Sequence, residues 1–410
     1  MTYDKLSKLF YKLTTSDYNL EYQKRKESYG CYSTNLTIKG FKRERLTNDT
    51  FELFYVNIPE LMKLNNEVLL NSSKISSLVN KLPGFVIEPY FNKLIINEAQ
   101  SNNEIEGVKS TKKELSDALK ELTKPEPKNK KFLGLMKTYL HIEDIDPFEK
   151  TESFRVLYDN LVADEISSDD IPDGELFRKG YVEVNDGNST THIGISSEKN
   201  IIIALKELID YLNDQSHPNL YRYMVAHYFY EYIHPFYDGN GRTGRLIVGS
   251  YLSRYLEKYS AITFSYAVNK NKSKYYKALE EVPSPLNKGE ITFYLIDMLQ
   301  LLSSGQKGII EDLEENLLKL NRINEYLSHD NWTEKANERE LLYILITINV
   351  FVQEDTELSL ANLMTLSKKS RYLINNSMTY LINHDYVEVA THYPKSFKVS
   401  RECLETIIPV

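Results

Sequence analysis

The segment at residues 220–233, LYRYMVAHYFYEYI, constrains the fold most, because it is apolar nearly all round at helical spacing. A helix without a polar face has to be buried on every side. Another predicted helix, at residues 201–213, precedes it, and an amphipathic one, RLIVGSYLSRYL, follows after a short loop. The pattern therefore predicts a mainly α fold, a helical bundle with residues 219–233 at its centre.

The N-terminal part combines a predicted strand pair with predicted helices. Residues 1 to about 50 are rich in tyrosine and lysine, and YGCYSTNLTIKGF has the composition of a short strand pair. From about residue 51, apolar residues recur at helical spacing through FELFYVNIPELMKLNNEVLL and again through YFNKLIINEAQSNNEIEG. The second helix is expected to end at Gly107, because glycine enters the left-handed conformation at little cost.

One β-hairpin is predicted inside a mainly helical block that runs from about 131 to 300. Two β-prone runs in GYVEVNDGNSTTHIGI, residues 180–195, flank the turn Asn185-Asp186-Gly187-Asn188. After a helical stretch at about 308–328, a helix is expected in ERELLYILITI, two more in LSLANLMTL and SRYLINNSMTYLIN, and strands in DYVEVA and SFKVS. This order resembles a winged helix, a helix-turn-helix with a small hairpin wing.

Composition narrows the setting of the protein. The formal net charge of −8 argues against broad nonspecific affinity for nucleic acid. Two cysteines near opposite ends do not suggest a disulfide framework, no long apolar run suggests a membrane span, and the start, MTYDKLSKLF, lacks a secretory pattern. We therefore expect a soluble, cytoplasmic protein without a membrane partner.

The loop from His234 to Arg245, between the two central helices, carries the densest chemistry in the sequence. Glycines on both sides of Asn240 allow successive backbone N–H groups to form an anion-binding concavity, and the helix that begins there adds the positive end of its dipole. Arg242 and Arg245 lie three residues apart, so both can reach one polyphosphate. The loop therefore predicts a phosphate site.

Two side chains of this loop suggest chemistry at that phosphate. Asp238 offers an oxygen ligand for Mg²⁺, which commonly binds through one or two carboxylates together with substrate phosphates. His234, with an ordinary pKa of about 6.5, can accept a proton from an attacking hydroxyl at neutral pH.

Two other interpretations stay open on these residues alone. A histidine before a proline is typical of a turn. Residues 239–244 also fit a dinucleotide-binding fingerprint, with Glu257 near the distance expected for a ribose-binding acid and the β-prone run AITFSYAV after the helix. That fingerprint requires a strand before its first glycine, whereas the preceding segment is predicted to be helical.

The run from His234 to Arg245 resembles the signature of the Fic family, His-x-Phe-x-Asp/Glu-Gly-Asn-Gly-Arg-x-x-Arg, at every fixed position. The similarity of pattern extends from about residue 95 to 300, and the C-terminal winged helix resembles an appendage of many bacterial members. The resemblance implies transfer of AMP from ATP to a Ser, Thr or Tyr hydroxyl of a target protein. It implies these roles: His234 as general base, Asp238 as Mg²⁺ ligand, and Asn240, Gly241, Arg242, Gly244 and Arg245 as the ATP phosphate site.

Two further segments match the family. The hairpin at 180–195 looks like the flap that pairs with an extended stretch of the target, with Val182, Glu183 and Val184 as docking residues. Asn269 and Tyr276 occupy the stretch that lines the adenine pocket in relatives. ATP, Mg²⁺ and a target protein are thus implied, while it stays open whether the target is this chain itself and whether the chain forms homo-oligomers.

Residues 102–107, Asn-Asn-Glu-Ile-Glu-Gly, resemble the inhibitory motif Ser/Thr-x-x-x-Glu-Gly/Asn that some members carry N-terminal to the core. Glu106 in the last turn of a helix faces the negative end of the dipole, at a cost of about 0.3–1 kcal/mol unless a cation answers it. In the family this glutamate pairs with the motif's last arginine, here Arg245, so that ATP binds unproductively. Asn102 departs from the preferred Ser or Thr, although an asparagine amide can supply the same hydrogen bond.

The expected regions follow from these assignments. They are an N-terminal region at 1–123 with the inhibitory helix at about 91–107, a Fic catalytic core at 124–305, a helical linker at 306–335 and a winged-helix domain at 336–410.

Other activities stay open at this point. Removal of AMP from modified proteins, with Glu106 orienting a water, would use the same motif. A DNA-binding regulator with an ATP-sensing site would use the winged helix, where Lys368, Lys369 and Arg371 begin the second helix and can contact DNA phosphates. His227, on the buried helix, is expected to be a core histidine and not a second base.

Overall fold

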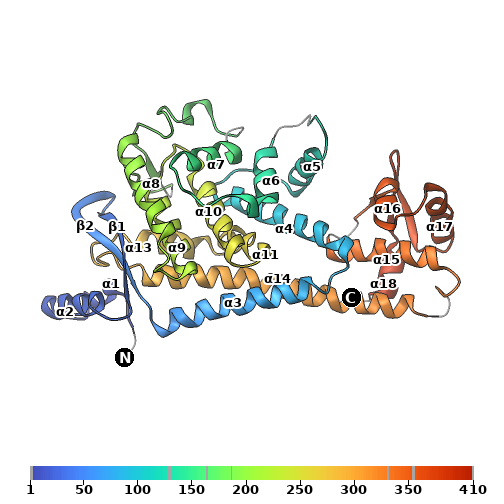
Figure 1. Ribbon diagram of the computed structural model, residues 1–410, viewed down its shortest axis with the longest axis horizontal. Helices are drawn as coiled ribbons and strands as arrows, with labels where there is room; N and C mark the ends of the chain where they lie inside the picture. Colours follow the sequence, from blue (N-terminus) through green and yellow to red (C-terminus); the bar gives the residue numbers. More distant parts are fainter. Residues whose placement is uncertain are drawn as a thin grey trace. The chain divides into compact units, whose positions relative to one another are not determined.

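In the computed structural model, the described residues fold mainly as helices, as predicted; they are 3–126, 131–162, 165–185, 187–329, 332–352 and 356–408 (Figure 1). The chain divides into two compact units, one formed by Met1–Ser73 and Ile95–Lys307 and the other by Lys74–Leu94 and Gly308–Val410. Three long helices contribute residues to both units: α3 (Pro59–Val79), α4 (Gly84–Ile105) and α14 (Thr292–Leu327). No described helix combines the length and apolar character that a bilayer crossing requires.

The first unit opens with these elements: α1 (Leu6–Leu9), α2 (Thr15–Lys26), β1 (Cys31–Lys42) and β2 (Arg45–Val56). The two strands form an antiparallel hairpin. Arg43 and Glu44, between the strands, both have positive φ, as in the type I′ turn whose twist matches that of a hairpin.

The sequence prediction for this hairpin was wrong in two places. The run YGCYSTNLTIKGF lies in one strand instead of a strand pair, and residues 51–56 belong to β2 instead of a helix. Apolar spacing over so few positions does not decide between helix and strand, and pairing with β1 supplies a ladder of backbone hydrogen bonds. The helix α3 starts only at Pro59, because proline suits the first helical position and keeps the preceding residue extended.

The second hairpin confirms the strand prediction within residues 180–195. It follows three helices, and the elements are α5 (Lys112–Leu122), α6 (Leu133–Leu140), α7 (Glu152–Val162), β3 (Glu183–Asn185) and β4 (Thr190–Ile193). The strands are short and antiparallel. Of the predicted turn, Gly187 has a φ of 94°, and Asp186 lies outside the described residues.

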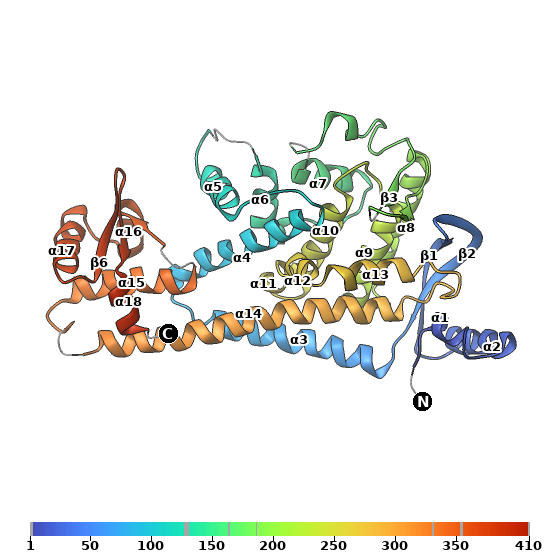
Figure 2. The same ribbon diagram turned by 180° about the vertical axis from the view of Figure 1, so that it is seen from behind.

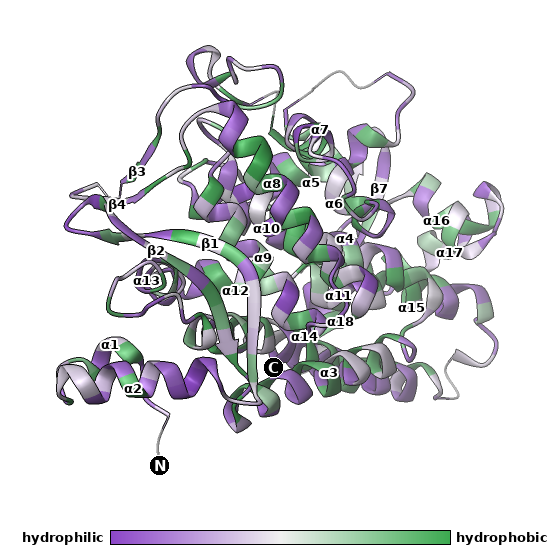
Figure 3. Cartoon of the chain, turned by 60° about the vertical axis from the view of Figure 1, so that its left-hand side comes forward, coloured by the Kyte–Doolittle hydropathy of each residue, from purple (hydrophilic) through white to green (hydrophobic). Residues whose placement is uncertain are grey.

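Three consecutive helices form the centre of the first unit: α8 (Glu198–Asn213), α9 (Asn219–Ile233) and α10 (Asn240–Tyr255). Every residue of α9 except Asn219 and Glu231 is buried, as its apolar sequence predicts. Both α8 and α10 pack on α9, and Figure 3 shows hydrophobic residues recurring along α8. The next helices, visible from behind in Figure 2, are α11 (Lys258–Ala261), α12 (Phe264–Lys270) and α13 (Lys272–Glu281); α11 and α12 contact α10, and α13 contacts α12.

These helices exclude the dinucleotide-binding interpretation. The segment before Gly239 is helical, and most of AITFSYAV lies in α12 or the turn before it instead of a strand. The sheets among the described residues have two or three strands, all paired antiparallel. Glu257 caps α11 by accepting a hydrogen bond from the backbone N–H of Ser260.

The second unit contains parts of α3, α4 and α14, and then these elements: α15 (Ala336–Phe351), β5 (Leu358–Ser359), α16 (Leu360–Ser367), α17 (Arg371–Asn383), β6 (Val387–His392), β7 (Lys395–Val399) and α18 (Arg401–Ile407). The strands form an antiparallel sheet in the order β5-β7-β6. The three helices and two main strands agree with the sequence prediction, whereas β5 and α18 were not predicted. The winged-helix assignment and the boundaries at 123, 305 and 335 stay predictions, and α14 runs unbroken through residue 305.

A buried ion pair joins α2 to the segment just before α14. Arg25 Nη1 lies 2.8 Å from Glu290 Oε2, and the two side chains are 4% and 0% exposed. The Tyr3 hydroxyl donates a hydrogen bond of 2.6 Å to the other carboxylate oxygen. Arg25 Nε also lies 2.9 Å from Oε1 of Glu21, whose side chain is one-third exposed.

We expect Glu290→Ala to lower the free energy of unfolding of the first unit by about 1–3 kcal/mol, because Arg25 Nη1 and the Tyr3 hydroxyl lose their buried acceptor while Glu21 still pairs with Arg25 Nε. Urea denaturation followed by circular dichroism measures this loss. Glu281→Ala is the matched control, since its pair with Lys5 is about one-third exposed and removal should cost below about 1 kcal/mol. Equal losses in the two variants would contradict the assignment of Arg25 and Glu290 as a structural pair.

Candidate functional site

The loop between α9 and α10 is held by hydrogen bonds of its own. His234 ends α9 in the left-handed conformation, with φ 51°, and its N–H donates to the Tyr230 carbonyl at 3.0 Å. The Asn240 amide binds Phe236 twice, accepting from its N–H at 2.9 Å and donating to its carbonyl at 2.8 Å. The Asn240 side chain thus shapes the loop, so the anion donors that remain are backbone N–H groups.

The first turn of α10 supplies those donors. Gly239 precedes it with a φ of 79°, which favours glycine, and the N–H groups at the start of a helix have no intrahelical acceptors. The Glu106 carboxylate lies against this turn at Gly241. A side chain at this position would collide with it, since a Cβ on Gly241 would lie only 2.2 Å from Glu106 Oε1. The Glu106 carboxylate therefore occupies the predicted anion site.

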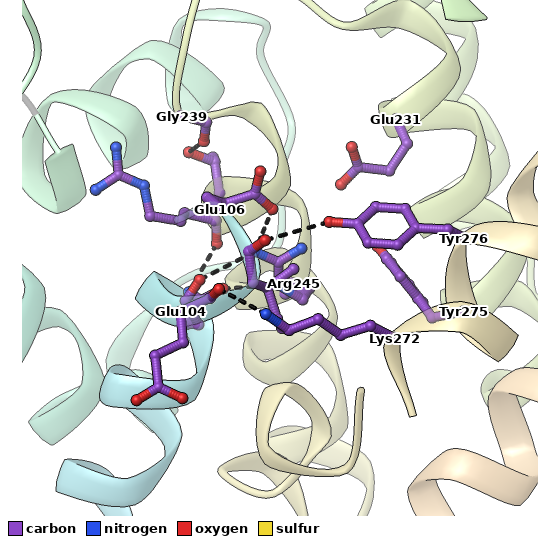
Figure 4. Close-up of polar contacts among 12 residues, drawn as sticks. Glu104, Glu106, Glu231, Gly239, Arg245, Lys272, Tyr275 and Tyr276 are labelled. Carbon is purple, nitrogen blue, oxygen red and sulfur yellow. Dashed lines mark hydrogen bonds and ion pairs between the residues drawn. The ribbon is translucent and has the colours of Figure 1, made fainter. Parts of the chain in front are cut away.

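Arg245 holds that carboxylate in place (Figure 4). Its Nη2 donates to Glu106 Oε1 at 2.6 Å, and its Nε donates to Asn102 Oδ1 at 2.7 Å. Asn102, at the position where the motif prefers Ser or Thr, also donates to the Tyr139 hydroxyl at 2.8 Å. Burial would lower the pKa of the Arg245 guanidinium, but Glu106, Tyr275 and Glu231 together offset burial and raise the pKa.

Arg242 has different partners from Arg245. Its guanidinium is 1% exposed and lies 2.8 Å from Glu165 Oε2 and 3.7 Å from Asp238 Oδ2. The two arginines thus have separate acidic partners in this structure. That both bind one polyphosphate stays a prediction. Sequence reasoning missed Glu165, because it lies 77 positions away and no local pattern marks it.

Asp238 is the loop residue placed to meet a metal ion. Half of its side chain is exposed, and Oδ1 accepts a 2.6 Å hydrogen bond from the Gly239 N–H. Among the described residues, no group of three or more His, Cys, Asp or Glu side chains could hold a metal. A single exposed carboxylate fits Mg²⁺ only if phosphate oxygens complete the coordination.

The environment of the His234 imidazole favours its neutral form. The ring is half-buried, and its centroid lies 6.2 Å from that of His192. Burial, followed by His192 and Arg178, lowers the pKa of His234 to about 3. The ring is therefore neutral at physiological pH.

Arg178, which the sequence analysis did not single out, ties the β3–β4 hairpin to this loop. Its buried guanidinium donates to the carbonyls of His234 at 2.8 Å, Ile195 at 2.9 Å and Gly180 at 2.6 Å. One cation thus fixes both ends of the hairpin beside the histidine. Acceptors that are all backbone carbonyls leave no signal in the sequence.

The predicted docking residues lie along the first strand of this hairpin. The Val182 carbonyl accepts the Gly194 N–H at 3.2 Å, Glu183 pairs with Ile193, and Val184 pairs with His192. Glu183 is exposed, and Val182 and Val184 are half-buried.

The end of α4 also contacts the two predicted adenine-pocket residues. Asn269 Nδ2 donates to Glu104 Oε2 at 2.7 Å, and the Tyr276 hydroxyl lies 3.4 Å from the Ile105 carbonyl. Lys272 Nζ adds a 2.7 Å hydrogen bond to the Glu104 carbonyl. The end of α4 therefore contacts both the first turns of α10 and the α12–α13 segment. The second of these contacts could not be predicted from the inhibitory motif.

Two other predictions have a clear structural context. His227 is a core histidine, as expected, with its Nε2 2.8 Å from the Tyr275 hydroxyl and its pKa lowered by burial to about 3. Lys368 is the left-handed residue after α16, and Lys369 pairs with Glu340 at 2.8 Å. The structure contains no nucleic acid, so DNA contact by these residues stays a prediction.

Comparison with known proteins finds a family match over the part of the chain that carries the site. The model of the Fic/DOC family matches residues 149–252, which include the whole His234–Arg245 run. The protein adenylyltransferase fic-1 of Caenorhabditis elegans is 34% identical over 101 residues, 22% of this chain and 20% of the relative. The match thus spans only a fifth of that protein's length.

The fold resembles that of a solved bacterial protein. The crystal structure of a Fic family protein from Desulfovibrio desulfuricans G20 matches with a TM-score of 0.51 and 17% identity, over 85% of this chain and 98% of that chain. At this identity the likeness concerns the fold alone.

We expect the His234 imidazole to stay neutral between about pH 5 and 8, because burial, together with His192 and Arg178, holds its pKa near 3. Histidine-selective ¹³C labelling and NMR titration measure this, and the spectrum of His234→Asn identifies the signal. A midpoint above about pH 5.5 would contradict the described environment of the ring.

Proposed function

We propose that this chain, whose residues 149–252 match the Fic/DOC family, transfers AMP from ATP to a hydroxyl of a target protein, and that Glu106 restrains the transfer. The observation that carries the proposal is the Glu106 carboxylate, which pairs with Arg245 against the first turn of α10. An anion-binding turn, a buried guanidinium and a neutral histidine at one loop suit chemistry on a polyphosphate.

The triphosphate would bind along the start of α10. The N–H groups of the first turn and the helix dipole would meet the phosphates, and Arg245 would bind the outer ones after Glu106 leaves. Mg²⁺, held by Asp238 with the phosphates, would neutralise charge that develops on the leaving pyrophosphate. The base would lie against Asn269 and Tyr276 on α12 and α13.

The target would present its hydroxyl along the β3–β4 hairpin. Arg178 holds this hairpin next to His234, so an extended segment paired with Val182–Val184 would bring its hydroxyl to the ring. His234 takes the proton of a Ser, Thr or Tyr hydroxyl, and that oxygen attacks the α-phosphorus. The new P–O bond forms as the bond to the β-phosphate oxygen breaks, and pyrophosphate leaves.

Inhibition would follow from competition for one cation. Glu106 and the outer phosphates both need Arg245 and the space over Gly241, so they cannot occupy the site together. The α4 end also engages Asn269 and Lys272, and its displacement would open the phosphate and base positions together. The segment at 336–410 is proposed to be a winged helix that binds a partner.

We expect Glu106→Gly to raise incorporation of label from α-³²P-ATP into protein at least about tenfold, a change of about 1.4 kcal/mol in effective barrier. His234→Ala in the same background should reduce incorporation by about 10²–10⁴, because the general base is lost. Gel autoradiography with a cell lysate as target measures both.

Glu44→Gly is the matched control for the first variant. Glu44 is exposed in a turn at positive φ, where glycine is accommodated, so the label should stay at the level of the unmodified sequence. Equal labelling of the Glu106 and His234 variants would refute the proposal. Release of free AMP from a pre-labelled target, without incorporation from ATP, would show AMP removal instead.

A further inference from the structure

Glu231 is a carboxyl group in the site that neither the sequence analysis nor the proposed transfer uses. It lies on α9, three residues before His234, and its side chain is 13% exposed. Figure 4 shows the carboxyl pointing from α9 toward Arg245 and Glu106. Glutamate side chains are rarely buried unless they are paired, so the position of Glu231 on this buried helix requires an explanation.

Two glycines of α10 make room for two carboxyl groups. A Cβ on Gly241 would lie 2.2 Å from Glu106 Oε1, and a Cβ on Gly244 would lie 2.2 Å from Glu231 Oε1. Because the glycines are three residues apart, they share one face of the first turns of α10. Glu106 and Glu231 therefore lie side by side along the surface where the proposed polyphosphate would run.

The Glu231 carboxyl is incompletely hydrogen-bonded in this state. Oε1 is buried and has no hydrogen-bond partner among the described residues, and the nearest ring nitrogen, His227 Nδ1, is 3.8 Å away and is itself without one. Buried polar atoms in folded proteins usually have a partner, so an orphaned one at a site is a candidate for ligand contact.

The surroundings favour the neutral acid. Burial raises the pKa of Glu231 to about 8, with Arg245 lowering it and Glu106 raising it. The other ionisable groups that interact with it are neutral at pH 7: His227, whose pKa is lowered, and Tyr230, Tyr275, Tyr276 and Tyr294, whose pKa values are raised. Near neutral pH the carboxyl is therefore an O–H donor, and it loses this proton as the pH rises through about 8.

We propose that Glu231 is a phosphate-binding residue, whose protonated carboxyl donates a hydrogen bond to the outermost phosphate beside Arg245. The proposal rests on the proposed function for the position of the nucleotide. When Glu106 leaves Gly241, a phosphate takes its place next to Gly244 and completes the contact that Glu231 lacks. An ionised Glu231 would instead place a second negative charge beside the phosphate and compete for Arg245.

The test uses the full chain with Glu106→Gly, so that the inhibitory carboxylate does not compete. Inorganic tripolyphosphate with Mg²⁺ is titrated by calorimetry between about pH 6.5 and 9. The affinity of this parent should fall about tenfold between these limits as the carboxyl ionises, and the fall is centred below pH 8, because Glu106, which raises the pKa of Glu231, is absent from this variant. Adding Glu231→Gln should keep the pH 7 affinity within about threefold and remove the fall, because an amide donates at every pH.

Glu231→Leu, which fills the space without a donor, should bind tripolyphosphate about tenfold more weakly at pH 7 and without the fall. AMP, which has no outer phosphate, should bind all three proteins alike and reports that the fold is intact. A pH profile in the Gln variant equal to that of the parent, or parental affinity in the Leu variant, would overturn the proposal.

The outcome also separates this proposal from the proposed function. Tripolyphosphate binding that follows the pattern above without label transfer from ATP would support Glu231 as a phosphate residue and refute adenylyl transfer. If AMP label is transferred but the tripolyphosphate affinity of the parent does not change with pH, only the role of Glu231 is refuted.

Discussion

The ion pair between Glu106 and Arg245 holds a carboxylate at the start of α10. The Arg245 side chain is 1% exposed, whereas Glu106 is 28% exposed. A guanidinium so deeply buried requires an anionic partner, because an unpaired buried charge costs several kcal/mol. Polyphosphate and carboxylate both satisfy it, so the proposed inhibition is an exchange of partners on a preformed site and needs no rearrangement of α10.

The contacts of α4 explain why this carboxylate arrives at the site. Glu98, one turn before Asn102, is buried and accepts the N–H groups of Ser265 and Tyr266 at 2.8 Å each, which fixes the helix on α12. Asn102 then binds Arg245, and Gly107 ends the segment with a φ of 74°. The last turn of α4 is thus held from three sides, and its two carboxylates face different helices of the core.

The sequence predicts the local part of the site well. A buried helix, a glycine-flanked loop and a helix start are encoded in consecutive residues, so the arrangement from α9 to α10 follows from residues 219–255. The partners of the site's charged groups are not local. Arg178 binds only backbone carbonyls, and Glu165 reaches Arg242 across 77 positions, so neither leaves a periodic or spaced pattern.

The errors in the fold have a similar origin. Residues 51–56 have helical apolar spacing, but their pairing with β1 decides their conformation. The sequence of one strand does not show which other segment it pairs with. Glu231 could not be singled out from the sequence, because one acidic residue in a buried helix forms no pattern. Its surroundings become visible only in the structure, where Gly244 on α10 and His227, one turn earlier on α9, lie next to its carboxyl.

A crystal structure of Glu106→Gly with Mg²⁺ and a non-hydrolysable ATP analogue tests the central claim most directly. The account predicts an outer phosphate over Gly241, bonded to Arg245, in the position that the Glu106 carboxylate takes here, with the α-phosphate facing His234. A triphosphate bound away from the first turn of α10, or an Arg245 that keeps its partners on α4 while the nucleotide is bound, would contradict it.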